Sequence, residues 1–296
     1  MFGVVTHHAC EIDVTEDIDV VDEEWGLDWV VDWLGGIRAG LGTRLRPLTD
    51  DRPKALVTVA GRTLLEITLS RLRSFGVSEV IVNAHHFAEQ IVDYLEANRN
   101  FGMRIEVSRE DVLLDTGGGL KKAAWFFLEA GADSAEPFLV HNVDVLSTVD
   151  LAAMVRYHEE QNALVILAVQ NREASRYLFF DGQNQLCGPR GGSLPLAEAL
   201  KAAQSETYLI KTSLAPPARD VQALAFCGIH VLSPRIFPMF QEAGTFSVIN
   251  AYLRLAALGE KILCFHADDS YWRDLGRPEN LSEAARELAN GTYRES

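Results

Sequence analysis

The sequence predicts an α/β protein with a mostly parallel sheet and helices on both faces. From residue 64 onward, segments with helical spacing of apolar residues alternate with short β-branched runs, a pattern typical of parallel sheets. The run ALVILAV (163–169) is apolar throughout, which indicates a strand covered on both sides. With 296 residues, 48% of them hydrophobic, the chain can bury a sizeable core, and we expect one main domain with additions.

The individual elements follow from these periodicities. Leu65, Leu69 and Leu72 recur at helical spacing, and Gly76 ends that helix. We expect strands at 77–83, 103–108, 137–142, 163–169, 223–233 and 261–267, and helices at 64–75, 87–98, 119–131, 150–162, 234–244, 246–259 and 278–290. The segment RYLFFDGQNQLCG (176–188) predicts a β-hairpin insertion about its Asp-Gly pair. Residues 188–220 are loop-like around one short helix at 196–204.

Composition limits the possible partners. The formal net charge of −15 argues against bulk attraction to nucleic acid or to an anionic membrane, because both are polyanions. No Lys or Arg precedes Arg38, and no apolar run reaches the length of a membrane span, so neither a secretory signal nor a membrane partner is expected. The four cysteines lie far apart without a C-x-x-C pair, which favours reduced thiols: Cys10, Cys187, Cys227 and Cys264. We expect a cytoplasmic protein, and the sequence leaves its oligomeric state open.

The first 34 residues differ in composition from the rest. Between residues 11 and 34, acidic side chains are interleaved with Val, Ile and Trp. A solvated acidic tail is the usual form of such a segment, but Trp25, Trp29 and Trp33 are apolar enough that we expect them to pack on the protein. We therefore divide the chain into an acidic N-terminal extension, partly disordered or atypical (1–34), a main domain (35–290) and a short tail (291–296).

The loop GLGTRLRPLTDDRPKAL (40–56) concentrates groups that suit a phosphate-rich ligand. Its glycines allow close backbone approach, its hydroxyl and guanidinium groups match phosphate oxygens, and its lysine adds a mobile charge: Gly40, Gly42, Thr43, Arg44, Arg46 and Lys54. A Walker loop and a dinucleotide fingerprint both fail on spacing, since the latter needs a third glycine where Leu45 stands. The expected ligand is a polyphosphate.

The whole string, Gly-x-Gly-Thr-Arg-Leu-x-Pro-Leu-Thr followed by Pro-Lys-Ala-Leu, resembles the signature of the sugar-1-phosphate nucleotidylyltransferases. The resemblance continues through VAGRTLLEITLSRL, VIVNAHHFAEQI, LLDTGGGL, LVHNVDVL and YWRDLGRPENL, and so covers roughly residues 35–290. It implies a Rossmann-like nucleotide-diphospho-sugar transferase fold for the main domain. The compact form with a DTGGG turn is most similar to the N-acetylmuramate-1-phosphate uridylyltransferase and mannose-1-phosphate guanylyltransferase-like branch.

The resemblance also implies roles for single residues. Arg44 would clamp the departing pyrophosphate, and Lys54 would bridge nucleotide phosphate and sugar phosphate. Asp144 and Asp274 would share a magnesium ion, and Asn142 would contact the sugar. The remaining nucleotide contacts would come from Ala39, Gly40, Gly42, Thr43, Gly117 and Gly118, the last two letting the nucleobase lie flat on the backbone.

The chemistry of nucleotidyl transfer requires such groups. When a sugar-phosphate oxygen attacks an α-phosphorus in line, two polyanions must be held together while charge builds on the leaving pyrophosphate. Mg²⁺ favours one or two carboxylates together with phosphate oxygens and water, which two separated aspartates provide. No protein nucleophile is required. The expected substrates are a nucleoside triphosphate and a sugar 1-phosphate, with Mg²⁺ as cofactor.

Each candidate also has a structural explanation. Arg44 and Lys54 could be solvated loop charges, and Asp144 could form a turn or cap the helix that follows. Asp274 could pair with the adjacent Arg273. The three glycines at 117–119 could be a hinge or a helix start. His85 and His86 follow a strand end, where they could reach the sugar or flank a helix, and His141 and His230 lie in apolar strand contexts typical of packing residues.

The sequence departs from the family pattern at three places. The strand before the phosphate loop reads WLGGIRAG, in which Arg38 stands where a small residue is usual; an upstream reading-frame shift is one hypothesis for this. Val143 precedes the metal aspartate where glycine is frequent, and should be tolerated if its side chain points away from the metal. No Glu-Lys-Pro occurs near the hairpin to supply a sugar-phosphate lysine. Two other functions thus stay open: a nucleotide-sugar-binding sensor or assembly subunit without turnover, and cytidylyl transfer to a phosphoalcohol.

Overall fold

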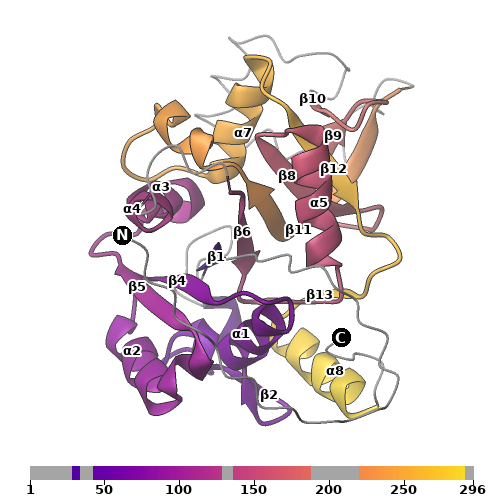
Figure 1. The fold of residues 1–296 in the computed structure, drawn as a ribbon. Coiled ribbons are helices and arrows are strands. Elements are labelled where there is room, and N and C mark those ends of the chain that lie inside the picture. Colours follow the sequence, from indigo (N-terminus) through magenta and orange to yellow (C-terminus); the bar gives the residue numbers. More distant parts are fainter. Residues whose placement is uncertain (1–28, 34–42, 129–135, 188–219, 291–296) are drawn as a thin grey trace, which may run out of the picture.

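A computed structural model describes residues 29–33, 43–128, 136–187 and 220–290, and it confirms the α/β class (Figure 1). The main sheet has nine strands. Across its width the order is β12-β8-β11-β6-β1-β4-β5, with β9 and β10 continuing from β11. These strands are β1 (Trp29–Trp33), β4 (Glu79–Ala84), β5 (Arg104–Arg109), β6 (Phe138–Asn142), β8 (Val165–Gln170), β9 (Leu178–Phe180), β10 (Leu186–Cys187), β11 (Gln222–Leu232) and β12 (Ile262–His266).

The central part of the sheet is mostly parallel, as the alternation of strands and helices predicts. Strands β6, β1, β4 and β5 run parallel, and β12 is parallel to β8. The exception is β11, which pairs antiparallel with both β6 and β8. The carboxyl ends of β6 and β8 therefore lie at the same edge of the sheet, where ligands of open α/β folds bind.

Strand β1 comes from the segment assigned to the acidic extension. WVVDW (Trp29–Trp33) lies between β4 and β6, with Val31 opposite Ile81 on one side and Val140 on the other. Residues 29–33 thus form a central strand, and the packing of the apolar side chains in this segment stays a prediction. The boundary at residue 34 stays a proposal, but the sheet includes these five residues.

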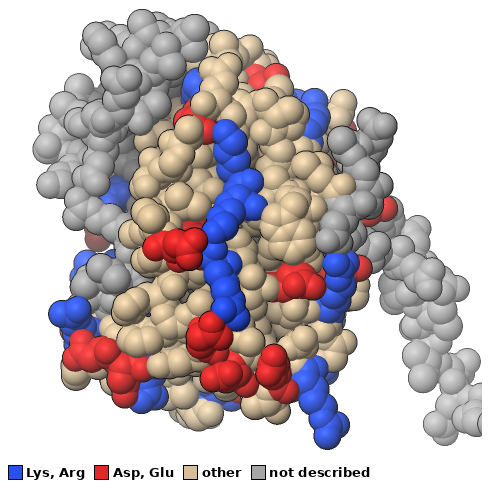
Figure 2. Space-filling view, turned by 90° about the vertical axis from the view of Figure 1, so that its left-hand side faces the viewer, with Lys and Arg blue, Asp and Glu red and all other residues tan. Residues whose placement is uncertain are grey.

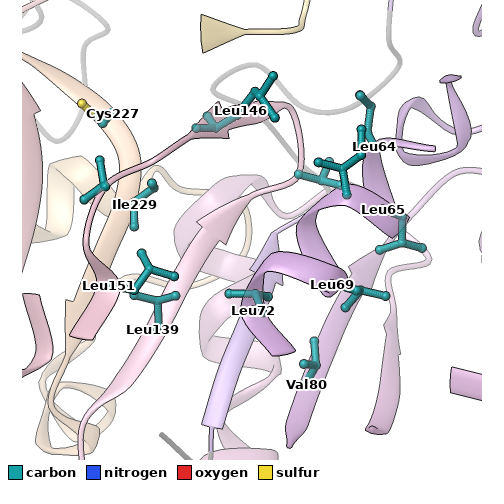
Figure 3. Close-up of a cluster of buried hydrophobic side chains, with 14 of the residues drawn as sticks. Leu64, Leu65, Leu69, Leu72, Val80, Leu139, Leu146, Leu151, Cys227 and Ile229 are labelled. Atoms are coloured by element: carbon teal, nitrogen blue, oxygen red, sulfur yellow. The ribbon is translucent and has the colours of Figure 1, made fainter. Parts of the chain in front are cut away.

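Helices cover both faces of the sheet because strand side chains alternate between them. Val80, Val82 and Leu139 contact one core cluster, whereas Ile81 and Val140 contact the other. The first cluster includes residues of α1, α2, α5 and α8, and Figure 3 shows the α1 leucines packed over β4 and β6. The second includes residues of α3, α4 and α7. The helices are α1 (Leu64–Ser74), α2 (Ala88–Ala97), α3 (Asp115–Lys122), α4 (Ala124–Leu128), α5 (Leu151–Gln161), α7 (Val248–Ala257) and α8 (Pro278–Ala289).

Short elements complete the described chain. The 3₁₀ turns are η1 (Thr43–Leu45), η2 (Lys54–Leu56), η3 (Arg99–Gly102) and η5 (Pro234–Met239), and two small ladders join β2 (Thr58–Val59) to β3 (Arg62–Thr63) and β7 (Val145–Ser147) to β13 (Trp272–Asp274). The predicted hairpin is confirmed: β9 and β10 pair antiparallel, and Asp181 accepts backbone hydrogen bonds from Gln183 and Gln185 in the turn. The expected helix at 196–204 lies outside the described residues.

Two helix predictions need correction. The segment 234–244 forms only the 3₁₀ turn η5, because Pro238 inside it cannot donate a helical hydrogen bond. The helix expected at 119–131 begins earlier, at Asp115, and α3 ends before α4 starts at Ala124. As a result the three glycines lie within the first turns of α3.

Surface charge is mixed. Figure 2 shows a face on which Lys and Arg form a narrow line bordered by Asp and Glu. Exposed ion pairs of this kind include Arg104 with Glu79 and Arg109 with Glu89. Among the described residues, no helix combines the length and the apolar character needed to cross a bilayer.

Candidate active site

A cavity of about 420 Å³ opens at the carboxyl ends of β6 and β8. Asn142 and Asp144 contribute from the end of β6 and the turn after it. The segment that follows β8 contributes Arg172 and residues 174–177, and β9 contributes Leu178. Strand β11 adds Phe226 to Gly228, and the β13–α8 region adds residues from Trp272 to Asn280. Four of the lining residues were predicted site residues: Arg44, Asn142, Asp144 and Asp274.

Lys54 and Asp144 form a buried ion pair at this cavity. Lys54 begins η2, Asp144 lies in the turn between β6 and β7, and the Lys54 ammonium donates directly to the Asp144 carboxylate. The two side chains are 9% and 7% exposed. Burial alone would raise the pKa of Asp144, but the charge and hydrogen bond of Lys54 bring that pKa below its ordinary value. The carboxylate is therefore held in its charged form.

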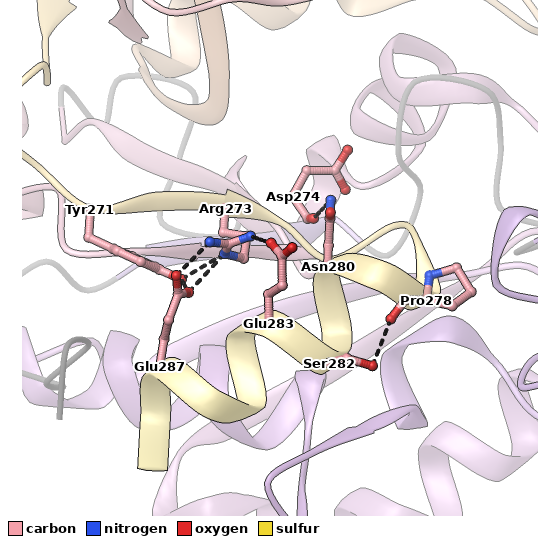
Figure 4. Close-up of polar contacts among 8 residues, drawn as sticks. All are labelled: Tyr271, Arg273, Asp274, Pro278, Asn280, Ser282, Glu283 and Glu287. Carbon is pink, nitrogen blue, oxygen red and sulfur yellow. Dashed lines mark hydrogen bonds and ion pairs between the residues drawn. The ribbon is translucent and has the colours of Figure 1, made fainter. Parts of the chain in front are cut away.

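The two predicted metal aspartates lie on neighbouring segments. Strands β7 and β13 pair antiparallel with Asp274 opposite Val145, and the Leu275 amide donates to the Asp144 carbonyl at 2.7 Å. Asp144 does lie in a turn, as its structural explanation allows, but within the described residues the helix-cap role of Asp144 and the pairing of Asp274 with Arg273 are not found. Helix α5 is capped by Asp150, and Arg273 pairs with Glu283 and Glu287 rather than with Asp274 (Figure 4).

Arg44 and Asp274 both lie close to Gly276, and so near each other. A Cβ atom built on Gly276 would lie 2.7 Å from Asp274 Oδ1 and 3.0 Å from Arg44 Nη2, so a larger residue would displace both. Asp274 Oδ1 accepts a hydrogen bond from the Gly276 amide at 2.6 Å. Among the described residues, no carboxylate pairs with Arg44. Its charge helps to lower the pKa of Asp144 and is not neutralised by an ion pair within the described residues, so it can meet an anionic ligand.

Asn142 and a glycine of β11 fit closely together. Gly228 has a φ of +76°, and a Cβ atom there would lie 2.7 Å from Asn142 Nδ2. Sequence reasoning missed Gly228, although a single glycine inside an apolar strand is a signal of close approach. Val143 is buried in the core, so it points away from the cavity, as its tolerance requires.

The glycines of the DTGGG turn lie elsewhere. The amides of Gly117 and Gly118 donate to the Phe246 carbonyl at 2.8 and 3.3 Å. A Cβ atom on Gly117 would lie 2.2 Å from the Phe246 ring, so here the glycine allows α3 to pack on the 244–248 segment. Neither glycine lines the cavity that holds Asp144, and their contact with a nucleobase stays a prediction.

Several predicted residues lie outside the described part of the chain, and the histidines do not line the cavity. Ala39, Gly40, Gly42 and Arg38 lie outside the described residues, and Thr43 is described only as the start of η1. His141 and His230 are buried, and burial lowers the pKa of each to about 3, in line with the packing interpretation. The ring of His85 contacts the Glu110 carbonyl at 2.7 Å and does not line the cavity.

The cavity holds cations that the sequence did not single out. Arg172, Arg176 and Arg277 line it, and none of the three forms an ion pair with a carboxylate in the described part of the chain. The Arg172 guanidinium lies 3.5 Å from the centroid of the Trp272 ring. Burial lowers the pKa of Arg172, because its charge has lost part of its hydration.

The donor set fits a magnesium ion that also binds phosphate. In the described residues no group of three acidic, histidine or cysteine side chains is gathered that could enclose a metal by itself. Two carboxylates on neighbouring segments are the protein ligands that Mg²⁺ takes when substrate phosphates supply further oxygens. Asp144 and Asp274 match that requirement.

The sheet topology, with a cavity at the carboxyl edge lined by two aspartates and several arginines, defines an α/β protein whose cavity suits a phosphate-bearing ligand. The sequence pattern described as nucleotidyl transferase matches residues 37–180. The chain is 31% identical over 262 residues to N-acetylmuramate alpha-1-phosphate uridylyltransferase of Caulobacter vibrioides, covering 86% of this chain and 95% of the relative. It is 29% identical to mannose-1-phosphate guanylyltransferase of Mycobacterium tuberculosis, covering 85% of this chain and 63% of that protein.

Solved structures agree on the fold. HddC from Yersinia pseudotuberculosis complexed with GMP-PN has a TM-score of 0.61 at 20% identity, covering 88% of this chain and 98% of that one. UDP-glucose pyrophosphorylase complexed with UDP-glucose has a TM-score of 0.67 at 16% identity, covering 90% and 99%. The chain belongs to the sugar-1-phosphate nucleotidyltransferase family, whose enzymes transfer a nucleotidyl group to a sugar 1-phosphate.

Proposed function

We propose that this chain joins a nucleoside triphosphate to a sugar 1-phosphate at the 420 Å³ cavity and releases pyrophosphate. The observation that carries the proposal is the arrangement of Asp144, Asp274 and Arg44. Two carboxylates on adjacent segments lie beside a guanidinium that has no carboxylate partner among the described residues. That arrangement suits a metal-bound triphosphate whose leaving end is a strong anion.

Asp144 and Asp274 would hold Mg²⁺, which supplies charge neutralisation and orientation of the phosphates when bound. Lys54 keeps Asp144 ionised and lies next to the place where the phosphates would bind. Arg44 would bind the pyrophosphate as charge develops on it, and Asn142 would contact the sugar. Gly40, Gly42 and Thr43 would contact the triphosphate, and Gly117 and Gly118 the nucleobase if α3 and the Phe246 segment separate.

The test is a pyrophosphate-release assay that combines four nucleoside triphosphates with sugar 1-phosphates and phosphoalcohols. We expect release with at least one sugar 1-phosphate, and loss of that release in EDTA. Release only with a phosphoalcohol would replace the proposal by a different transfer. Nucleotide binding without any release would favour the sensor.

Asp144→Asn provides the matched variant. The amide cannot supply a full carboxylate charge to the metal, so we expect turnover to fall below detection while the circular dichroism spectrum keeps its native shape. A variant with the wild-type rate would remove Asp144 from the mechanism.

A further inference from the structure

Strand β13 presents two residues to the cavity. Trp272 and Asp274 are alternate residues of the strand, so their side chains project to one side, and both line the cavity. Arg273, between them, projects to the other side and binds Glu283 and Glu287 on α8. The cavity side of β13 therefore carries an aromatic ring next to a metal-binding carboxylate.

Two guanidinium groups flank that carboxylate. Arg44 Nη2 lies 3.0 Å from the Cβ position of Gly276, two residues after Asp274. Arg172 lies over the ring of Trp272, two residues before Asp274. Both arginines line the same cavity. Two cationic groups thus lie near the Asp274 segment, one beside Gly276 and one over Trp272.

Arg172 is fixed in position without being neutralised. Its Nη2 donates to the Phe226 carbonyl at 3.1 Å, and its guanidinium is stacked on Trp272. The Trp272 ring is itself anchored, because Nε1 donates to the Cys227 carbonyl at 2.7 Å. Within the described part of the chain, the buried Arg172 Nε has no hydrogen-bond partner, and no carboxylate pairs with the side chain. Asp274 attracts the Arg172 charge and the Cys227 side chain contacts it, but neither forms an ion pair with it in the described residues. A partly desolvated guanidinium held in this way is suited to bind a phosphate.

We infer that Arg172 binds the phosphate of the sugar 1-phosphate, in place of the lysine that the hairpin region lacks; this rests on the proposed function. In the reaction, a phosphate oxygen of the sugar 1-phosphate forms a bond to the α-phosphorus, and the bond from that phosphorus to the oxygen of the β-phosphate breaks, releasing pyrophosphate. The entering and leaving oxygens must lie roughly in line on opposite sides of the α-phosphorus. Arg44 and Arg172 come from different segments and line the same cavity, so one can bind the leaving group while the other binds the entering group.

The experiment measures kcat and KM for both substrates in Arg172→Gln and Arg172→Lys. We expect the KM for the sugar 1-phosphate to rise about tenfold or more in Arg172→Gln, while the KM for the triphosphate stays within about twofold. Arg172→Lys keeps the charge but loses the planar fork, so it should recover part of the loss. Arg235→Gln is the control, because Arg235 also donates to a backbone carbonyl, that of Asn162, but does not line the cavity.

The outcomes separate the inference from the proposed function. If the wild type turns over and Arg172→Gln changes both KM values equally, or neither, the inference is wrong and the function stands. If the wild type releases no pyrophosphate, the proposed function fails. Titration of α-D-glucose 1-phosphate into the pyrophosphate-loaded wild type and Arg172→Gln then decides the inference: weaker binding by the variant supports it, and equal affinity overturns it.

Discussion

The charged side chains on the two sides of strand β13 differ in whether they form ion pairs within the protein. On the α8 side, Arg273 Nη2 donates to Glu287 at 2.6 Å, Nε donates to the same carboxylate at 2.9 Å, and Glu283 provides a second carboxylate (Figure 4). Burial alone would lower the pKa of Arg273, but its hydrogen bonds to Glu287 and Tyr271 raise that pKa above its ordinary value. On the cavity side, the Asp274 carboxylate accepts a hydrogen bond from the backbone amide of Gly276. Within the described chain, it forms no ion pair, and neither do the nearby arginines Arg44 and Arg172.

This difference separates structural charge from functional charge. A network whose charges are already paired gains little from a ligand, so its value is in attaching α8 to β13. A group of charges left without protein partners is unstable alone and gains most when a counter-charge arrives. Substitutions on the two sides should therefore affect different quantities: rate on the cavity side and stability on the α8 side.

The largest effect is expected for Asp274→Asn. The asparagine side chain keeps the shape and can still accept from the Gly276 amide, but it removes the negative charge on which the proposed magnesium site depends. We expect kcat to fall more than about 100-fold, with the free energy of unfolding nearly unchanged. Steady-state kinetics and urea unfolding provide both numbers. A large loss of stability with a normal rate would place Asp274 with the structural charges.

Arg44→Ala is expected to have the next largest effect. Arg44 is exposed and has no carboxylate partner in the described chain, so its removal forfeits little packing. We expect a loss in kcat of roughly 30-fold, because a charge-assisted bond to the leaving pyrophosphate is made mainly in the transition state. Parallel losses of rate and stability would instead indicate a structural arginine.

The sequence predicted the two aspartates that line the cavity, but it did not predict the arginine and tryptophan that line it with them. Asp144 comes just after β6, where the general rule on α/β sheets places ligand-binding residues, whereas Asp274 ends β13 and was expected at the site from the family motif. The stack of Arg172 on Trp272 joins residues 100 positions apart in the chain, and no local pattern encodes such a contact.

Two further features depended on contacts that no local pattern shows. WVVDW, within an acidic segment, has the composition of a tail, yet it pairs on both sides as a central strand because tertiary pairing outweighs local composition. The role of Gly117 depended on Phe246, more than a hundred residues later, whose ring occupies the space a side chain would need.

The buried histidines differ from both sides of β13, because burial keeps them neutral. His158 on α5 is 5% exposed; burial, assisted by the charge of Arg235, lowers its pKa from 6.5 to about 4. Below pH 6.5 the unfolded chain therefore binds a proton that the folded chain does not, so stability falls as the pH drops from about 6.5 towards 4.

At pH 5 we expect this histidine to lower the free energy of unfolding by about 2 kcal/mol relative to pH 7. Urea unfolding of the wild type and His158→Leu at both pH values measures it: the variant should lose less stability on acidification. His266→Gln, at an exposed position, is the control. Identical pH dependence in wild type and His158→Leu would show that His158 is protonated equally in both states.

The smallest effect, and the one that completes the comparison, is expected for Arg273→Met. Methionine retains much of the apolar stem, so the loss is confined to the bonds with Glu283 and Glu287, and the two carboxylates are left close together near Tyr271. Because the Arg273 side chain is 23% exposed, solvent screens the network, and we expect a loss of about 1 kcal/mol in the free energy of unfolding. The rate should stay within about twofold of wild type, since Arg273 faces away from the cavity. A drop in kcat comparable to that of Asp274→Asn would mean that the α8 side of the strand also positions the metal ligands, and the division of β13 into a structural and a functional side would fail.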